Sequence, residues 1–132
     1  MKESKQGKFH ALNKGLKTVK TKYVITLDAD TLLLPSSVQY LITRIEQSPK
    51  EVAAVAGSML VKNSRDSIWT KIQEWDYFLA IASIKRLQGL YQGTLVAQGA
   101  YSIYKSNLLK KNDGWPDAIG EDIVLTWRLL KK

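Results

Sequence analysis

Apolar side chains recur along the chain with spacings that alternate between helical and strand-like. Residues 9–18 are predicted to form a short basic helix, and the β-branched run 23–27 is typical of a strand. Pro35 suits the first turn of a second helix, which ends before Pro49. That helix has four apolar residues at helical spacing: Val38, Leu41, Ile42 and Ile45. The first part of the chain is therefore predicted to form helix, strand, polar loop and helix.

The middle of the chain is predicted to form a buried strand followed by a long helix. Residues 52–61 are mostly apolar and β-branched, with an interruption at Gly57. Residues 66–87 carry apolar side chains on one helical face, and Gly89 closes the helix. This face is expected to pack in the core: Ile68, Ile72, Trp75, Leu79 and Ala82.

The last part is predicted to form another strand and another helix. Residues 95–104 have the pattern of a strand, interrupted at Gln98-Gly99-Ala100, where a glycine lets a substrate approach the backbone or forms a bulge. Gly114-Trp115-Pro116 is predicted to be a turn. Residues 121–130 are predicted to form a helix with three side chains directed inward: Ile123, Trp127 and Leu130.

Two pairs of carboxylates occupy the ends of these elements. Asp28 and Asp30 directly follow the first strand, where a carboxylate pair can hold a divalent cation against a phosphate. Glu121 and Asp122 open the last helix, where Asp122 is a candidate general base. Ordinary structural explanations stay open for both pairs, because acids also form turns and cap helices. A calcium-binding loop is excluded by Leu33, which stands where such a loop requires glycine.

Composition narrows the functional classes. The 132 residues carry a net charge of +8 and no cysteine, which excludes disulfides and thiolate metal sites. The single histidine, His10, does not argue for a catalytic triad. No run approaches the about 18 apolar residues that span a bilayer, and no signal-peptide pattern opens the chain, so this piece is expected to be soluble. Seven lysines among residues 1–22 form either a solvated arm or a surface for anions; aromatics do not alternate with them, so no nucleic acid is expected as a partner.

Four sequence blocks together resemble family 2 glycosyltransferases. They are Gly-Lys-Phe-His-Ala-Leu-Asn-Lys-Gly at 7–15, Leu-Asp-Ala-Asp-Thr at 27–31, Ile-Gln-Glu-Trp-Asp-Tyr-Phe at 72–78 and Gly-Glu-Asp-Ile-Val-Leu-Thr-Trp-Arg-Leu at 120–129. Their order and spacing most resemble the processive, membrane-associated branch that makes poly-N-acetylglucosamine, hyaluronan, chitin and cellulose. The resemblance implies a partial GT-A fold, an α/β sandwich with a mixed, mainly parallel sheet flanked by helices.

The resemblance also implies a reaction and a site. The reaction would be an inverting displacement from a UDP-sugar onto a growing polysaccharide, assisted by Mg²⁺ or Mn²⁺. By position, Asp28 and Asp30 would face the donor diphosphate and its metal, with Asp30 the better candidate for direct ligation. Asp122 would be the general base, supported by Glu121. The remaining matches are Lys8 and Asn13 in the donor site and Gln98, Gly99 and Trp115 near the acceptor.

The chain also departs from the family pattern. The uracil-binding strand that opens such domains, the Gln-x-x-Arg-Trp block and the transmembrane helices have no counterpart, and Gly120 stands where many processive members have threonine. Residues 1–132 are therefore expected to be one partial catalytic domain of a protein at the cytoplasmic face of the cell membrane, with UDP-N-acetylglucosamine as the preferred donor. The isolated piece is expected to be inactive and to self-associate through an unpaired sheet edge. Two alternatives stay open: a metal-dependent phosphohydrolase that uses Asp28, and a non-catalytic basic module that binds anionic lipid or nucleic acid.

Overall fold

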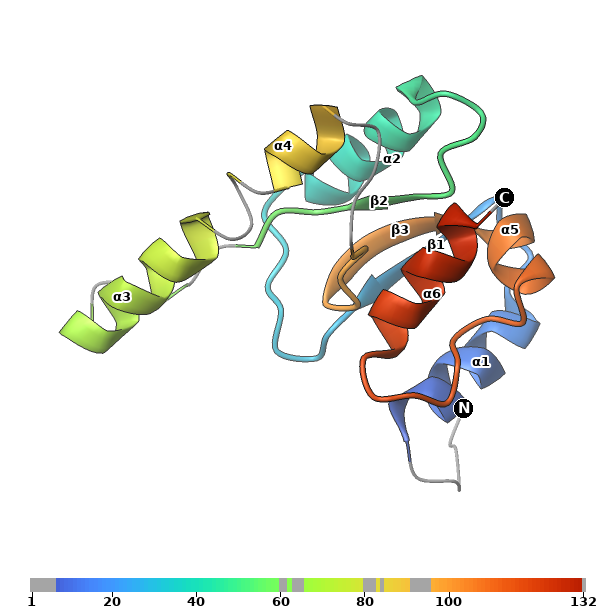
Figure 1. Ribbon diagram of the computed structural model, residues 1–132, viewed down its shortest axis with the longest axis horizontal. Helices are drawn as coiled ribbons and strands as arrows, with labels where there is room; N and C mark the ends of the chain where they lie inside the picture. The colour runs from blue at the N-terminus through green and yellow to red at the C-terminus, as the bar shows by residue number, and fades with distance from the viewer. Residues whose placement is uncertain are drawn as a thin grey trace. The chain divides into compact units, whose positions relative to one another are not determined.

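The computed structural model describes residues 7–59, 62, 66–79, 83, 85–90 and 96–131. Its helices and strands follow in the order α1 Lys8–Thr18, β1 Tyr23–Leu27, α2 Ser37–Gln47, β2 Ala54–Ala56, α3 Ile68–Tyr77, α4 Lys85–Leu90, β3 Tyr101–Lys105, α5 Ser106–Lys111 and α6 Glu121–Leu130 (Figure 1). The chain divides into two compact units. The first comprises Met1–Gly57 with Val96–Lys132, and the second Ser58–Leu95.

A three-stranded sheet forms the centre of the first unit. β3 lies between β1 and β2 and pairs antiparallel with both, so that Ile103 faces Ile25 on one side and Val55 on the other. The α/β prediction is confirmed. These three strands form no parallel pair. β1 and β2 run in the same direction but are not neighbours, because β3 lies between them and runs in the opposite direction.

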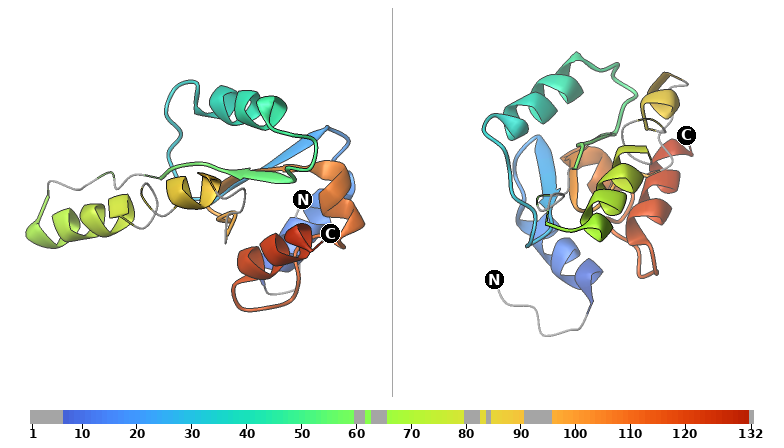
Figure 2. Two further views of the ribbon diagram at one scale, coloured as in Figure 1. Left: turned by 45° about the horizontal axis from the view of Figure 1, so that its top comes forward. Right: turned by 90° about the vertical axis from the view of Figure 1, so that its left-hand side faces the viewer.

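Helices cover both faces of this sheet. α2 lies over one face, and α1, α5 and α6 lie over the other (Figures 1 and 2). The side chains of the main core cluster come from helices, strand and loops of the first unit: Leu16, Ala97, Tyr104, Leu109, Trp115 and Leu125. The core thus joins α1, β3, α5 and α6, the elements that surround the acidic residues.

Most predicted elements are confirmed, with differences at the short ones. The strand expected over 52–61 is confined to Ala54–Ala56, with residues 60 and 61 outside the described range. α5 was not predicted, because its six residues are too few to show a helical period. None of the described helices has the length and apolar character that crossing a membrane requires.

The helix predicted over 66–87 is found as α3, α4 and helical turns at residues 78, 79 and 83, with residues 80–82 and 84 outside the described range. The prediction that it faces the core is wrong. The expected core face is exposed at all its described positions: Ile68 74%, Ile72 50%, Trp75 65% and, just after α3, Leu79 51%; Ala82 lies outside the described residues. α3 has no buried residue at all, so a helical period alone did not establish a buried face.

The predicted inward face of α6 is also wrong. Ile123, Trp127 and Leu130 are 41%, 56% and 54% exposed, whereas Leu125 and Thr126 are buried. Apolar residues occupy most positions of this helix, so periodicity could not select the buried face. The hydroxyl of Thr126 is hydrogen-bonded, which allows a polar residue to lie inside.

Candidate active site

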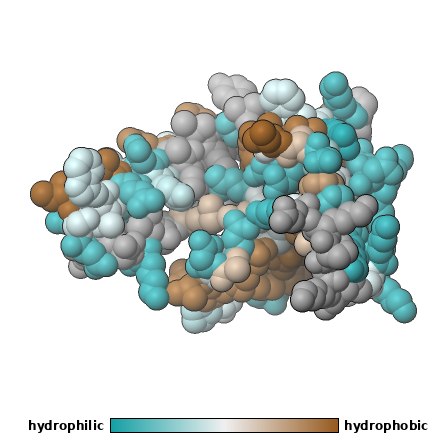
Figure 3. Space-filling view, turned by 90° about the horizontal axis from the view of Figure 1, so that it is seen from below, coloured by the Kyte–Doolittle hydropathy of each residue, from teal (hydrophilic) through white to brown (hydrophobic). Residues whose placement is uncertain are grey.

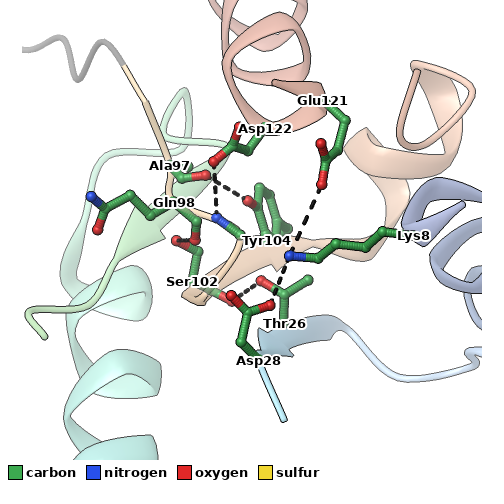
Figure 4. A network of polar contacts seen from close by, with 10 residues as sticks. Lys8, Thr26, Asp28, Ala97, Gln98, Ser102, Tyr104, Glu121 and Asp122 are labelled. Atoms are coloured by element: carbon green, nitrogen blue, oxygen red, sulfur yellow. Dashed lines mark hydrogen bonds and ion pairs between the residues drawn. The ribbon is translucent and has the colours of Figure 1, made fainter. Parts of the chain in front are cut away.

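The carboxylates predicted from the sequence meet where β1 ends and α6 begins. Asp28 follows β1, and its backbone N–H donates to the carbonyl oxygen of Ala100 at 3.1 Å, which ties the end of β1 to the turn before β3. α6 begins after Gly120, whose φ of 75° lies in the left-handed region that glycine adopts without strain. Asp28 and Asp122, far apart in sequence, therefore lie in one group of side chains (Figure 4).

Lys8 lies between Asp28, at the end of β1, and Glu121, at the start of α6. Its Nζ is 2.7 Å from Asp28 Oδ1 and 4.0 Å from Glu121 Oε1 (Figure 4). The hydrogen bond to Asp28 raises the pKa of Lys8 above its ordinary value, and the negative charges of Asp28, Glu121 and Asp122 raise it further, against a lowering by partial burial. Lys8 is therefore a positive charge at neutral pH, placed on α1 among three carboxylates.

Asp122 is held at the first turn of α6 by two backbone N–H groups. Gly99 donates to its Oδ2 at 3.3 Å, and Ile123 donates to its Oδ1 at 2.9 Å. A Cβ atom at residue 99 would lie 3.4 Å from Lys8 Nζ and 3.9 Å from Asp122 Cβ, so Gly99 is next to both charged groups. Its backbone thus reaches the carboxylate expected to act as the base.

The loop 97–99 is fixed by side chains that the sequence did not single out. Thr126 Oγ1 accepts from Ala97 N at 2.9 Å and donates to the carbonyl of Asp122 at 2.7 Å. Tyr104 OH donates to Ala97 O at 3.0 Å, and Ser102 Oγ donates to Gln98 O at 2.6 Å (Figure 4). Burial raises the pKa of Tyr104 to about 12, which keeps its hydroxyl a donor at neutral pH. A threonine four residues after Asp122, one helical turn on, was the only signal in the sequence.

Thr126→Val is expected to destabilise the protein by about 1–3 kcal/mol. Valine keeps the shape of threonine but leaves the Ala97 N–H without its partner in a buried place, and that loss has a cost of this size. Chemical denaturation with the parent chain as reference would measure it, and hydrogen exchange at the Ala97 amide would show whether the loop opens. Thr126→Ser, which retains the hydroxyl, should preserve the protection of that amide; equal protection in Thr126→Val would contradict the assignment.

Asp30 and Gln98, two further predicted site residues, have side chains without a described polar partner. Asp30 is exposed and, among the described residues, has no hydrogen-bond or ion-pair partner. Gln98 is half-buried, and its Oε1 has no partner in the described part of the chain. Its backbone oxygen, by contrast, accepts the bond from Ser102.

Asn13 and Trp115 form a separate structural pair. Asn13 Nδ2 donates to Trp115 O at 2.7 Å, and Trp115 N donates to Asn13 Oδ1 at 2.9 Å. The Trp115 ring is only 3% exposed and packs edge-on against Tyr104, with ring centroids 5.9 Å apart. The contacts of both residues are thus with the protein core.

A hollow of about 420 Å³ opens beside Lys8 and Glu121. The residues that line it come from the start of α1 and the loop before α6: Gly7, Lys8, Phe9, Asp117, Ala118, Ile119 and Glu121. Its size suits part of a small ligand. The charged group is therefore accessible from a concave surface.

The carboxylates of Asp28 and Asp30 suit a hard divalent cation. Both offer oxygen ligands, and that of Asp30 is free. No group of three or more acidic, histidine or cysteine side chains that could hold a metal is found within the described ranges. A metal here would fit two protein carboxylates whose remaining partners are water or a phosphorylated substrate.

Comparison with known proteins identifies the family of this chain. Residues 1–112 match the model of the family "Glycosyl transferase family 2". The poly-beta-1,6-N-acetyl-D-glucosamine synthase of Staphylococcus epidermidis is 37% identical over 128 residues, and that of Staphylococcus aureus strain COL is 34% identical over the same length. Each alignment covers 96% of this chain and 31% of the relative, so the chain spans about a third of the length of the curated relatives it matches. The family match, together with the α/β fold and the acidic cluster, shows that the chain belongs to glycosyl transferase family 2, whose catalytic domains have the GT-A fold.

Proposed function

We propose that this chain is part of an enzyme that transfers N-acetylglucosamine from a UDP-sugar to a growing β-linked polysaccharide. The observation that carries the proposal is the placement of the Asp122 carboxylate next to Gly99 N–H, in one group with Lys8 and Asp28. The relatives named above are synthases of a polymer of this sugar, which supports the choice of donor and product. The whole enzyme would work at the cytoplasmic face of the cell membrane.

The donor diphosphate would bind on the side of Lys8, Asp28 and Asp30. Lys8 supplies a positive charge for a phosphate, and Asp30 is the carboxylate free to ligate Mg²⁺ or Mn²⁺, because Asp28 Oδ1 is shared with Lys8. When bound, the metal would neutralise charge that develops on the departing diphosphate. Asn13 belongs to this side through its position, and its bonds to Trp115 support the wall of the site.

Asp122 would remove the proton from the acceptor hydroxyl. The hydroxyl oxygen forms a bond to the anomeric carbon while the bond from that carbon to the phosphate oxygen breaks. The proton passes to Asp122, UDP leaves, and the configuration inverts. The Gly99 N–H steadies the Asp122 carboxylate, and Glu121 balances the charge of Lys8. Gln98 and Gly99 would border the acceptor sugar, and Trp115 would support this side from the core through its packing against Tyr104.

Asp30→Ala is expected to weaken metal-dependent UDP binding by the isolated chain. Amide shifts near Lys8 and Asp28 would be followed by NMR as UDP is added with Mg²⁺. Because this variant removes the free carboxylate, the metal-dependent gain in UDP affinity should fall by about tenfold or more. Binding is expected to be weak and turnover absent, so shifts rather than product are the readout.

Glu51→Ala is the matched control, since Glu51 is an exposed carboxylate of the same unit that precedes β2 at the Lys105 end of the sheet, opposite the end that carries Asp28. It should leave UDP binding unchanged. Equal metal-dependent binding in both variants would contradict the assignment of Asp30, and the absence of any UDP shift near Lys8 would contradict the donor site itself.

A further inference from the structure

A second concave site lies at the opposite end of the sheet from the acidic cluster. The Tyr23 end of β1 pairs with the Lys105 end of β3, whereas Asp28 follows the other end of β1. A five-residue strand is about 15 Å long, which separates the two ends. A hollow of about 550 Å³ opens at the Tyr23 end, and its lining comes from the loop after α1 and the junction of β3 with α5: Val19, Lys20, Thr21, Lys22, Lys105, Ser106, Asn107 and Lys110.

The lining of this hollow, hereafter the lysine hollow, is strongly basic. Four of its eight residues are lysines and none is acidic. Only Lys22 has a carboxylate partner among the described residues, Glu46 at 3.5 Å, and both of these side chains are largely exposed. Figure 3 shows a mostly hydrophilic right-hand edge on the side of α1 and α5. The positive charge of the hollow is therefore not neutralised by the part of the protein that the structure describes.

Two of the lysines are held in place by backbone carbonyls. Lys105 Nζ donates to Lys50 O at 2.8 Å, and Lys110 Nζ donates to Val19 O at 2.6 Å. A carbonyl fixes the position of an ammonium group without cancelling its charge, and each ammonium has two further N–H groups to donate. The lysines are thus partly ordered before any anion arrives, which lowers the entropic cost of binding.

Ser106 supplies a second observation in the same place. Its hydroxyl is buried, the residue is 5% exposed, and the oxygen has no hydrogen-bond partner within the described ranges. Buried hydroxyls in folded proteins are usually bonded, so Ser106 keeps an unused hydrogen-bond donor in the lining of the hollow.

We propose that the lysine hollow binds a phosphate-bearing anion, independently of the donor site at Lys8. Four lysines contribute to the lining of one concavity, and two of their ammonium groups are already positioned, which suits the several oxygens of a phosphate or diphosphate. A soluble phosphate compound and an anionic lipid headgroup share this chemistry. The inference does not depend on the proposed transferase reaction.

Titration of the chain with inorganic pyrophosphate, followed by amide NMR, tests the proposal. Saturable shifts are expected at residues 19–22 and 105–107, and not at Lys8 and Asp28. The double variant Lys105→Gln/Lys110→Gln should weaken binding by about tenfold, because two charge-assisted hydrogen bonds are lost. The control Lys71→Gln/Lys131→Gln has the same net charge, and its two exposed lysines do not line the hollow. It should change the affinity by less than about twofold.

Lys20→Gln keeps the test decisive if the double variant unfolds. Lys20 is exposed and contributes charge to the hollow, so its loss should weaken binding by about threefold without affecting the fold. Equal affinities in the parent, Lys20→Gln and the charge-matched control would overturn the proposal, as would pyrophosphate shifts that do not saturate or that centre on Lys8.

Vesicles distinguish the two sources of phosphate. The chain would be floated with phosphatidylglycerol vesicles and, for comparison, with phosphatidylcholine vesicles. A lipid headgroup would be assigned to the hollow if the chain floats only with phosphatidylglycerol. In that case pyrophosphate should compete with the vesicles, and the double variant should not float. Saturable pyrophosphate binding without flotation would assign it to a soluble phosphate compound. A third outcome would contradict a defined site: the double variant and the charge-matched control float equally, and pyrophosphate binding does not saturate. Flotation would then reflect only the general attraction of a basic protein to an anionic surface.

Discussion

Asp122→Asn is expected to lower sugar transfer by a factor of about 100 to 10,000, the usual contribution of a general base. The assay would use a chimera in which this chain replaces the matching segment of the Staphylococcus epidermidis synthase, with which it is 37% identical over 128 residues. Asparagine can still accept the bond that Gly99 or Ile123 donates, but it cannot take a proton from a hydroxyl at neutral pH. Incorporation of labelled N-acetylglucosamine from its UDP derivative into polymer would give the rate.

Two controls separate the chemistry from folding. Glu51→Gln makes the same change, from carboxylate to amide, at an exposed side chain at the Lys105 end of the sheet, and it should keep the rate of the unsubstituted chimera. In the isolated chain, Asp122→Asn should retain metal-dependent UDP binding, because Asp28, Asp30 and Lys8 are untouched. A chimera that makes polymer at a similar rate with and without Asp122 would contradict its role as the base. An unsubstituted chimera that folds but makes no polymer would count against the proposed function.

The helices and strands were predictable where the sequence signals for their ends and their apolar spacing agree with the side chains that are buried. α1, β1, α2 and α6 have nearly the expected bounds, because each has clear end signals such as Pro35 or the acids at 121–122. The burial of α3 and α6 was not predictable: α3 has an apolar face that is exposed, and α6 has apolar residues at most of its positions. Which side of such a helix is buried depends on tertiary contacts, here the bonds that draw Thr126 inward.

The candidate site was predictable in its residues but not in its geometry. Family resemblance selected Lys8, Asp28 and Asp122, and the structure brings them together. The bonds that fix the loop 97–99 could not be predicted, because the side chains of Thr126, Tyr104 and Ser102 become neighbours of that loop only when β3 packs on α6. Asn13 shows the opposite case, where a residue chosen for the donor site also has a structural role: its amide holds the backbone of Trp115.

Gly114→Ala is expected to destabilise the chain by about 3–4 kcal/mol, because residue 114 combines a left-handed backbone with a close neighbour. Its φ is 69°, which costs a residue with a Cβ atom about 1–2 kcal/mol. The new methyl group would overlap the amide oxygen of Asn13 and lie 3.1 Å from Leu16 Cδ2. Asn13 would have to move and release its two bonds to Trp115, at about 1 kcal/mol each.

Gly15→Ala is the matched control for this prediction, since the same methyl group is added within the interior of α1. Apart from its chain neighbours and the backbone of α1, no described atom lies within 4 Å of the Cβ position there, and alanine favours a helix over glycine by about 0.5–1 kcal/mol. Chemical denaturation of the two variants should therefore give changes of opposite sign. A Gly114→Ala variant as stable as the parent would mean that Asn13 does not hold Trp115 in solution. The wall between the donor side and the core would then have to be stabilised by the packing of Trp115 against Tyr104 alone, since no other described side chain bonds the Trp115 backbone.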